Sequence, residues 1–386
     1  MYVIIGEHLI KSLFFCKNEP RNRGFCQFLA TGDRMTTLTE IGSTEYLTTG
    51  HREPTMRDVA MRAGVSIKTV SRIINQEPGV SEKLSQRVQQ AIRELDYRHN
   101  ATASNLRRAD QRTATIGLLL DDVANPFSSA LHRAVEEVAR QHNTLVFALS
   151  SVDDPKREEE IIYALATRRV DGLITVPVSR DGGGLRYLQR QGQPIVFVDR
   201  LATFYEADTV VVDNRSGAAQ AVQHLVRHGH SRIAFLGDVS TIWTAAERYL
   251  GYVEGLAIEG IRLNPSFVCQ GLCGIEAAEQ AVLDLFAPER PPTALFTAQN
   301  LITIGAIRAL QKTALQHKVA LIGFDDFLLA DLLEPPVSVI AQDPMLLGKS
   351  AAELLFARLQ GDRQPSQQIV IPTQLIARGS GEIPSA

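Results

Sequence analysis

The sequence predicts a small all-α helix-turn-helix head followed by an α/β core of two doubly wound lobes. Between residues 55 and 98, three short capped helical segments follow one another, with a glycine turn between the first two. From Thr115 onward, apolar strand-like runs alternate with helical segments. We expect about ten strands at a spacing of roughly 20–30 residues, which is too many for one sheet and fits two.

Composition separates the head from the rest of the chain. Hydrophobic residues make up 45% of the 386 residues and charged residues 22%, as in an ordinary globular protein. The net charge is −3, but residues 55–112 carry eleven Lys/Arg against six Asp/Glu, so this segment is +5 and the remainder is −8. A basic module on an acidic body favours a polyanionic partner for the module alone.

The first 54 residues show no convincing periodicity. We expect either a disordered extension or a start codon assigned too far upstream, with Met35 or Met56 as the true start. Met56 is the weaker choice because it would delete Thr55, an expected helix cap. No stretch approaches the ~18 apolar residues of a membrane span, and no secretory signal is evident, so we expect a cytoplasmic protein.

Capping residues mark where each helix of the head begins. Ser and Thr at these places accept hydrogen bonds from backbone N–H groups that the helix itself leaves unpaired. The expected order is Thr55 with Asp58 for the first helix, a tight turn at 64–66, Ser66 before a second helix over 67–74, and Ser81 before a third helix that runs to about Leu95.

The second helix of the head is the expected recognition helix. Such a helix enters the major groove with its N-terminal residues against base edges. Lys68 and Arg72 would donate to guanine, Ile67 would contact a thymine methyl, and neighbouring hydroxyl and amide groups would hold phosphates. The alternative is an ordinary amphipathic helix with a solvated basic face. The candidate DNA-binding residues of the head are Ser66, Ile67, Lys68, Thr69, Ser71, Arg72 and Asn75.

The core alternates strands with helices and shows no tandem repeat in its sequence. Several runs are continuously apolar, which is typical of parallel strands covered on both faces. The expected strands are 115–120, 145–149, 172–176, 195–198, 209–212, 232–236, 294–297 and 319–323. The expected helices are 126–142, 157–168, 184–191, 215–228, 246–259, 276–286, 302–312 and 345–360.

Motifs spread along the chain resemble those of a known family. Residues 55–75 closely resemble the DNA-binding head of the lactose/galactose repressor family of bacterial transcription regulators. The likeness extends over essentially all of 55–382. It includes Asn125-Pro126-Phe127, Val170-Asp171-Gly172-Leu173-Ile174, Val198-Asp199-Arg200, Arg248-Tyr249-Leu250-Gly251-Tyr252 and Gly323-Phe324-Asp325-Asp326. Each motif is weak alone, but their order and spacing together are specific.

The resemblance implies a hinge over residues 99–112. In that family the segment orders into a helix on the operator, and a leucine wedges into the minor groove. Leu106 matches that DNA-binding leucine, and Asn100 matches the residue that opens the hinge helix. His99 stands where the family usually has Pro, and Ser104 where it often has Arg, so this hinge would fold less readily or contact a different base step. The alternative is an unstructured linker.

The resemblance also implies an effector cleft. The core resembles the periplasmic sugar-binding-protein fold, in which a ligand lies between two lobes. Open α/β sheets bind ligands beyond the carboxyl ends of their strands, which independently favours the same region. Phe127 is as readily a core residue, and Asp325 would otherwise cap a turn. The residues that match effector-binding positions are Phe127, Asp199, Arg248, Gln299 and Asp325.

Two departures leave the effector open. The family usually has Asn-Asp where this chain has Gln299-Asn300, and often an aromatic residue at the position that aligns loosely with Cys273. The sequence therefore allows a sugar, a sugar acid or a small non-sugar compound.

The expected domains follow from these assignments. They are an extension over 1–54, the head over 55–98, the hinge over 99–112 and the core over 113–382, with a first lobe of about 113–212 and 343–366 and a second lobe of about 213–342 and 367–382.

Signs of catalysis are lacking. The acid pairs at 121–122, 153–154 and 325–326 are typical of loop turns, and no nucleophile elbow, P-loop or dinucleotide fingerprint occurs. His228-Gly229-His230 matches the family's Gly-His turn, and the four cysteines lack metal spacing. We therefore expect no enzyme, no metal and no cofactor. A solute-binding protein for transport would share the core but not the basic head.

The combined prediction is a DNA-binding transcription regulator, in the simplest case a repressor, that acts as a homodimer on a near-palindromic operator. An effector bound between the core lobes would change the spacing of the two hinge segments and so the affinity for the operator.

Overall fold

The computed structural model describes residues 54–74, 78–98, 112–202 and 204–385. The chain separates into two compact units, the head up to Arg98 and the core from His99 onward. The predicted contact residues Asn75 and Leu106, with Asn100 of the hinge, lie outside the described residues.

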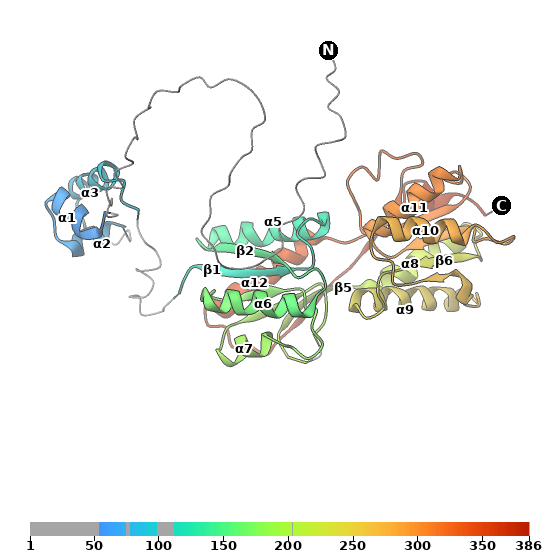
Figure 1. Ribbon diagram of the computed structural model, residues 1–386, viewed down its shortest axis with the longest axis horizontal. Coiled ribbons are helices and arrows are strands. Elements are labelled where there is room, and N and C mark those ends of the chain that lie inside the picture. The colour runs from blue at the N-terminus through green and yellow to red at the C-terminus, as the bar shows by residue number, and fades with distance from the viewer. Residues whose placement is uncertain (1–53, 75–77, 99–111, 203, 386) are drawn as a thin grey trace, which may run out of the picture. The chain divides into compact units, whose positions relative to one another are not determined.

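Three helices form the head, as predicted (Figure 1). They are α1 (Met56–Ala63), α2 (Ile67–Ile74) and α3 (Glu82–Glu94). Apolar side chains from all three helices make one small core. Its buried members are Val59, Ala60, Ala63, Val70, Val88 and Ala91.

Ser66 caps α2 as expected, and α1 begins with a contact between Thr55 and Asp58, whereas Ser81 makes no side-chain cap hydrogen bond to α3 within the described residues. The backbone N–H of Thr55 donates to Asp58 Oδ2 at 2.8 Å, and the N–H of Thr69 donates to Ser66 Oγ at 3.1 Å. Between the two helices, Gly64 has φ +63°, the left-handed conformation that ends α1 and that glycine adopts without steric cost. These contacts fix the turn from which the helix-turn-helix takes its shape.

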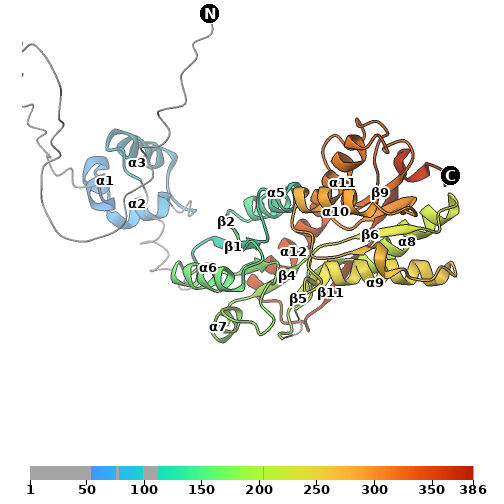
Figure 2. The ribbon, with the colours of Figure 1, turned by 45° about the vertical axis from the view of Figure 1, so that its right-hand side comes forward.

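The first lobe is a six-stranded parallel sheet in the order β11-β5-β4-β3-β1-β2. Helices α5 and α12 cover one face and α6 and α7 the other (Figures 1 and 2). The strands are β1 (Thr115–Leu120), β2 (Leu145–Ser150), β3 (Leu173–Thr175), β4 (Ile195–Val198), β5 (Asp208–Val212) and β11 (Gln368–Ile371). The helices are α5 (Pro126–Gln141), α6 (Pro155–Thr167), α7 (Leu185–Arg190) and α12 (Pro344–Leu359).

The second lobe has the order β12-β10-β9-β8-β6-β7, in which only β12 runs antiparallel to its neighbour. Helices α8 and α9 cover one face, and α10 and α11 cover the other. The strands are β6 (Ile233–Leu236), β7 (Val268–Cys269), β8 (Ala294–Thr297), β9 (Ala320–Phe324), β10 (Ser338–Ala341) and β12 (Gln374–Ile376). The helices are α8 (Asn214–Arg227), α9 (Trp243–Ile258), α10 (Ile275–Leu285) and α11 (Asn300–Lys312), with short 3₁₀ turns η1 (Pro265–Phe267) and η2 (Ser380–Glu382).

The two lobes repeat one strand order, because β1 to β5 and β11 correspond in turn to β6 to β10 and β12. The chain passes between the lobes after β5, after β10 and after β11. The last passage comes later than the sequence predicted. Residues 368–371 form β11 and pair with β5 of the first lobe, whereas we expected the second lobe to resume at about 367.

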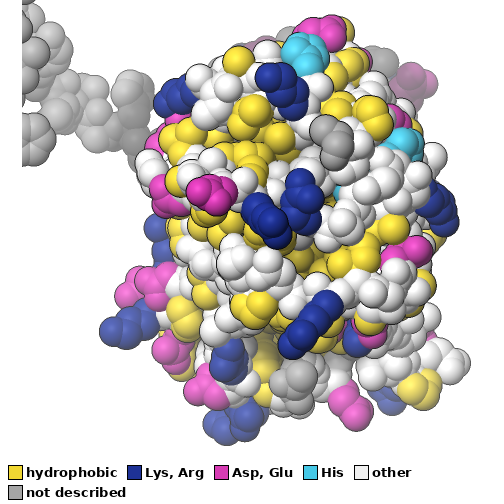
Figure 3. Space-filling view, turned by 90° about the vertical axis from the view of Figure 1, so that its right-hand side faces the viewer, with side chains coloured by type: hydrophobic (Ala, Val, Ile, Leu, Met, Phe, Trp, Pro, Cys, Tyr) yellow, Lys and Arg dark blue, Asp and Glu magenta, His cyan; other side chains and the backbone are white. Residues whose placement is uncertain are grey.

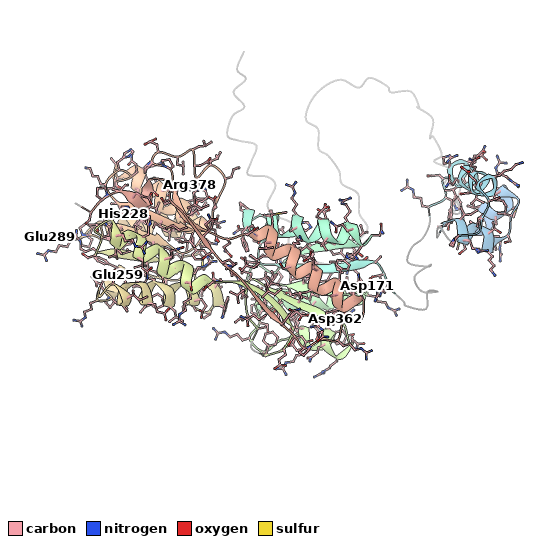
Figure 4. The ribbon with its side chains drawn as sticks, turned by 180° about the vertical axis from the view of Figure 1, so that it is seen from behind. Asp171, His228, Glu259, Glu289, Asp362 and Arg378 are labelled. Atoms are coloured by element: carbon pink, nitrogen blue, oxygen red, sulfur yellow. The ribbon has the colours of Figure 1, made fainter. Side chains whose placement is uncertain are left out.

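Polar contacts anchor segments of both lobes (Figure 4). In the second lobe, Arg378 donates to the two carboxylate oxygens of Asp326 at 2.7 and 2.6 Å. In the first lobe, Asp171 Oδ1 accepts hydrogen bonds from the N–H and the hydroxyl of Thr113 at 2.7 and 3.0 Å. This second contact fixes the chain just before β1. Asp326 thus has the structural role expected for the second acid of its pair.

Glycines allow the paired helices of each lobe to pack closely. A Cβ atom on Gly251 of α9 would lie 2.2 Å from Arg215 O and 2.8 Å from Ala218 Cβ, both on α8. A Cβ atom on Gly348 of α12 would lie 2.5 Å from Leu131 O on α5. Because the obstructing atoms include helix backbone, they cannot yield without separating the helices.

We predict that Gly251→Ala lowers the free energy of unfolding by about 1–3 kcal/mol, since the added methyl forces α8 and α9 apart. Urea unfolding of the full chain followed by circular dichroism measures this. Leu250→Ala is the control, because Leu250 lies on the same helix and is 39% exposed. Equal stability of Gly251→Ala and the wild type would contradict the close approach of the two helices.

Candidate functional sites

The predicted recognition helix α2 presents its N-terminal end to solvent. Ile67 is 42% exposed and Lys68 is exposed, whereas Thr69, Ser71 and Arg72 are half-buried. Accessible side chains at the N-terminal end are what a helix needs if it reads base edges.

Contacts within the head hold this helix in place. Arg72 donates through Nη2 to Pro78 O at 3.1 Å, which ties α2 to the loop before α3. Arg87 of α3 donates to Ala63 O at 2.6 Å and so joins α3 to the end of α1. These contacts hold the three helices of the head in fixed positions, so the orientation of α2 is fixed as well.

A cleft lies between the two lobes of the core, beyond the carboxyl ends of several strands. Atoms leave about 640 Å³ free there, including space open to solvent. The five side chains that the sequence predicted for an effector site all line it, and they come from both lobes. The residues that line it include Asp121, Asn125, Phe127, Asp199, Arg200, Asp238, Arg248, Gln299, Asp325 and Gln342.

Arg248 organises the second-lobe side of the cleft. It is 5% exposed, and its guanidinium carbon lies 3.8 Å from the ring centre of Phe324. Its Nε donates to Asn214 Oδ1 at 2.7 Å and its Nη1 to Ala298 O at 2.8 Å. Nη1 also lies 3.6 Å from Asp325 Oδ2. A buried guanidinium with this many partners is rigid, and it positions a positive charge at the wall of the cleft.

Two aspartates occupy matching places in the two lobes. Asp199 follows β4 with φ +69°, and Asp325 follows β9 with φ +73°. Residues other than glycine rarely adopt this left-handed conformation, and such backbone strain gathers at binding sites. Asp325 also accepts a hydrogen bond from Gln342 Nε2. The strand ends thus aim one carboxylate from each lobe at the same cleft.

Three charged residues of the cleft were not among the predicted site residues: Asp121, Arg200 and Asp238. Asp121 directly follows β1, and Asp238 comes two residues after β6. The rule that ligands bind beyond strand ends would have found both acids. The pairing of Asp121 with Asp122 favoured its interpretation as a loop turn.

Arg200 gathers acids on the first-lobe side. Its Nη1 donates to Asp153 Oδ1 at 2.5 Å, its Nε lies 3.7 Å from Asp199 Oδ2, and its Nη2 lies 4.0 Å from Asp121 Oδ2. Burial raises the pKa of Asp121 to about 6, with a further rise from neighbouring Asp153. Burial likewise raises the pKa of Asp199 and that of Asp238.

The histidines of the Gly-His turn have structural partners. His230 is hydrogen-bonded through Nδ1 to Thr293 Oγ1 at 2.9 Å and through Nε2 to Ile383 O at 2.8 Å. In the part of the chain that the structure describes, no group of three or more His, Cys, Asp and Glu is placed to hold a metal ion. No described helix is long and apolar enough to cross a membrane.

Comparisons with known proteins match both units. Residues 55–100 match the family described as "Bacterial regulatory proteins, lacI family", and residues 222–381 match "Periplasmic binding protein-like domain". The repressor CytR of Escherichia coli K12 is 30% identical over 328 residues, which are 84% of this chain and 96% of CytR. This chain belongs to the LacI family. Another relative, the regulator GalR of E. coli K12, is 32% identical over 333 residues, or 86% of this chain and 96% of GalR.

Solved structures share the architecture of this LacI-family chain. The lac repressor dimer bound to operator and the anti-inducer ONPF has a TM-score of 0.76 at 26% identity, covering 86% of this chain and 99% of that one. The regulator CelR in complex with cellobiose has a TM-score of 0.64 at 28% identity, covering 85% and 99%. The chain is accordingly a DNA-binding transcription regulator and not an enzyme. The predicted helix-turn-helix head and two-lobed core are confirmed.

We predict that Asp121→Asn raises the free energy of unfolding at pH 7.5 by about 1–3 kcal/mol. The raised pKa means that the folded protein holds a proton which the unfolded chain releases, so the wild type loses stability as the pH rises from about 4 through about 6. At pH 3.5 the carboxyl is protonated in the folded state and mostly protonated in the unfolded chain, so the gain should shrink to about a few tenths of a kcal/mol.

Urea unfolding at the two pH values checks this prediction. Glu136→Gln, which removes an exposed carboxylate on α5, serves as the matched control. A stability difference that does not change with pH would show that Asp121 ionises as an ordinary surface acid.

Proposed function

We propose that this regulator is a cytoplasmic homodimeric repressor whose affinity for its operator is controlled by a sugar or sugar-like effector bound between the core lobes. The observation that carries the proposal is the cleft itself. Phe127 and Asp199 from the first lobe and Arg248, Gln299 and Asp325 from the second lobe line one space. A ligand there touches both lobes at once, so it favours one angle between them over another.

On the DNA side, we assign base contacts to Ile67, Lys68 and Arg72, with Ser71 on the same face of the helix. Phosphate contacts are assigned to Ser66, Thr69 and Asn75, and Leu106 is the minor-groove wedge. The exposed N-terminal end of α2 supports the assignment. The core offers no comparable basic surface on the second-lobe face in Figure 3, where side chains of both signs are interspersed. The net charge of +5 on residues 55–112 favours the head as the part that binds a polyanion.

The effector acts on DNA binding through the relative positions of two heads. One head reads each half-site, so binding depends on the spacing of the two segments that join heads to cores. A coupling free energy of about 1–3 kcal/mol between cleft and operator changes the affinity by roughly 5–150-fold. The chain crosses between the lobes after β5, after β10 and after β11. A change in the angle between the lobes at these crossings would change the spacing of the segments that join heads to cores.

Exposed apolar side chains support a second copy of the chain as the partner. β2 is an edge strand, and Leu145, Phe147 and Leu149 on one of its faces are 70%, 44% and 36% exposed. In the second lobe, Leu328 and Leu332 are 82% and 74% exposed. An apolar edge strand is a hazard in a monomer and is usually covered. Association through both lobes would cover these residues.

We predict that Arg72→Ala weakens specific binding to the operator by about 5–150-fold, as loss of one bidentate base contact does. Fluorescence anisotropy of the full chain with its own upstream DNA, in a salt series, measures the affinity. Arg140→Ala is the control, because Arg140 is an exposed arginine of the core. If the Arg72→Ala variant bound the operator as tightly as the wild type, the assignment of α2 to the operator interface would be wrong.

The same anisotropy assay, repeated with sugars and sugar acids, tests the effector half of the proposal. A compound that changes the affinity of the wild type for operator DNA by at least fivefold supports control through the cleft. An effect that survives unchanged in Arg248→Lys would place effector binding elsewhere, because the shorter ammonium cannot keep the three contacts of the guanidinium.

We predict that Phe147→Glu shifts the protein from dimer toward monomer, because the charge on β2 would be buried against the second copy. Sedimentation velocity at micromolar concentration measures the change. Ile258→Glu is the control, since Ile258 is 66% exposed at the end of α9, away from β2. An unchanged dimer would show that β2 is not part of the interface.

A further inference from the structure

The effector cleft carries more negative than positive charge. Its charged lining consists of Asp121, Asp199, Asp238, Asp325, Arg200 and Arg248. A further carboxylate, Asp153, lies behind this lining and takes the closest contact of Arg200. Among the described residues, five carboxyl groups thus share two guanidinium groups, so the acids of the cleft outnumber its cations by three.

The two guanidinium groups are bound within the protein. Arg248 uses Nε and Nη1 for Asn214 and Ala298, and it pairs with Asp325. Arg200 holds Asp153 through Nη1. Neither arginine is an unpaired cation that an anionic ligand would neutralise.

Within the part of the chain that the structure describes, two further polar atoms at the cleft have no hydrogen-bond partner. Arg200 is 7% exposed, yet its Nε has no acceptor within hydrogen-bond distance. Gln342 Oε1 is buried and has no donor. Unpaired buried polar groups are costly. A ligand oxygen beside Asp199 would satisfy the Nε donor, and a ligand O–H or N–H would satisfy Gln342.

The acids are not arranged around a metal ion, since the described residues contain no group of three metal-ligating side chains. A sugar acid or a phosphate ester would add a like charge to the excess already present. An organic ammonium group would instead lower the repulsion among the acids, and it donates hydrogen bonds to carboxylates at full charge. Phe127 adds an aromatic ring to the same lining, which attracts cations through its face.

We propose that the effector of this regulator is a hydroxylated amine, a molecule that joins a protonated amino group to hydroxyl groups, as amino sugars do. The proposal rests on the proposed function of the cleft as the effector site. The ammonium group lies among Asp121, Asp199 and Asp238, and hydroxyl groups meet Arg200 and Gln342. Neutral sugars bind more weakly than their amino counterparts, and sugar acids more weakly still.

The test uses a small-molecule extract of cells that make the protein, separated at pH 7 on a cation exchanger and an anion exchanger. Each fraction is added to the full chain, and its melting temperature is measured. The fraction retained by the cation exchanger should raise the melting temperature by several degrees. A rise produced instead by the unretained fraction or by the anion-exchanger fraction overturns the proposal.

A charge variant gives a second test with the same active fraction. Asp238→Asn removes one unmatched carboxylate, and about tenfold more of the fraction should be needed for the same rise in melting temperature. Glu353→Gln removes an exposed carboxylate on α12, outside the cleft, and should behave as wild type. An unchanged response of Asp238→Asn overturns the proposal.

In parallel, the binding of the wild-type chain to operator DNA is measured with no extract fraction added. Loss of specific DNA binding would overturn the proposed function as a repressor, whereas the exchanger that retains the active fraction decides the charge of the ligand. The two failures are therefore distinguishable.

Discussion

The buried guanidinium of Arg248 is the contact on which the effector cleft depends. A charge that is 5% exposed has to be satisfied by fixed partners, and these come from three places in the second lobe. Asn214 begins α8, Ala298 follows β8, and Asp325 follows β9. One side chain of α9 thereby sets the positions of three strand and helix ends. The stacked ring of Phe324 closes the fourth side and leaves the guanidinium one orientation.

Under the proposed effector role of the cleft, the tightly held second-lobe wall would require the lobes to move against each other when a ligand binds. The two lobes are joined by several passages of the chain rather than by a single linker. Such a movement would be a rotation about the crossing segments, which is the kind of two-state change that allosteric control of DNA binding requires.

Much of this architecture is readable in the sequence, and the parts that are not have physical reasons. Long apolar strands such as β1 and the capped helices of the head were predicted at nearly their observed bounds. The short strands β7 and β12 were not, because two or three residues carry no detectable period. Strand β11, with which the chain stays in the first lobe to residue 371, was missed because an edge strand of mixed exposure resembles a loop.

For the site, family resemblance supplied five cleft residues that the structure brings together. The charge balance of the cleft was not predictable in this way, because it depends on which acids the fold places around Arg200. Asp121 and Asp153 are 32 positions apart and meet only through the sheet. Sequence spacing cannot show that such acids repel one another, since their interaction exists only in three dimensions.

The lobes share one strand order, and an aspartate in the left-handed conformation follows β4 in one and β9 in the other. Under the proposed role of the cleft, a ligand is therefore held by two matching sets of strand ends that face each other. Each set can change without loss of the other. New effector specificities in such a protein are accessible by altering one lobe at a time while its twin continues to hold the ligand.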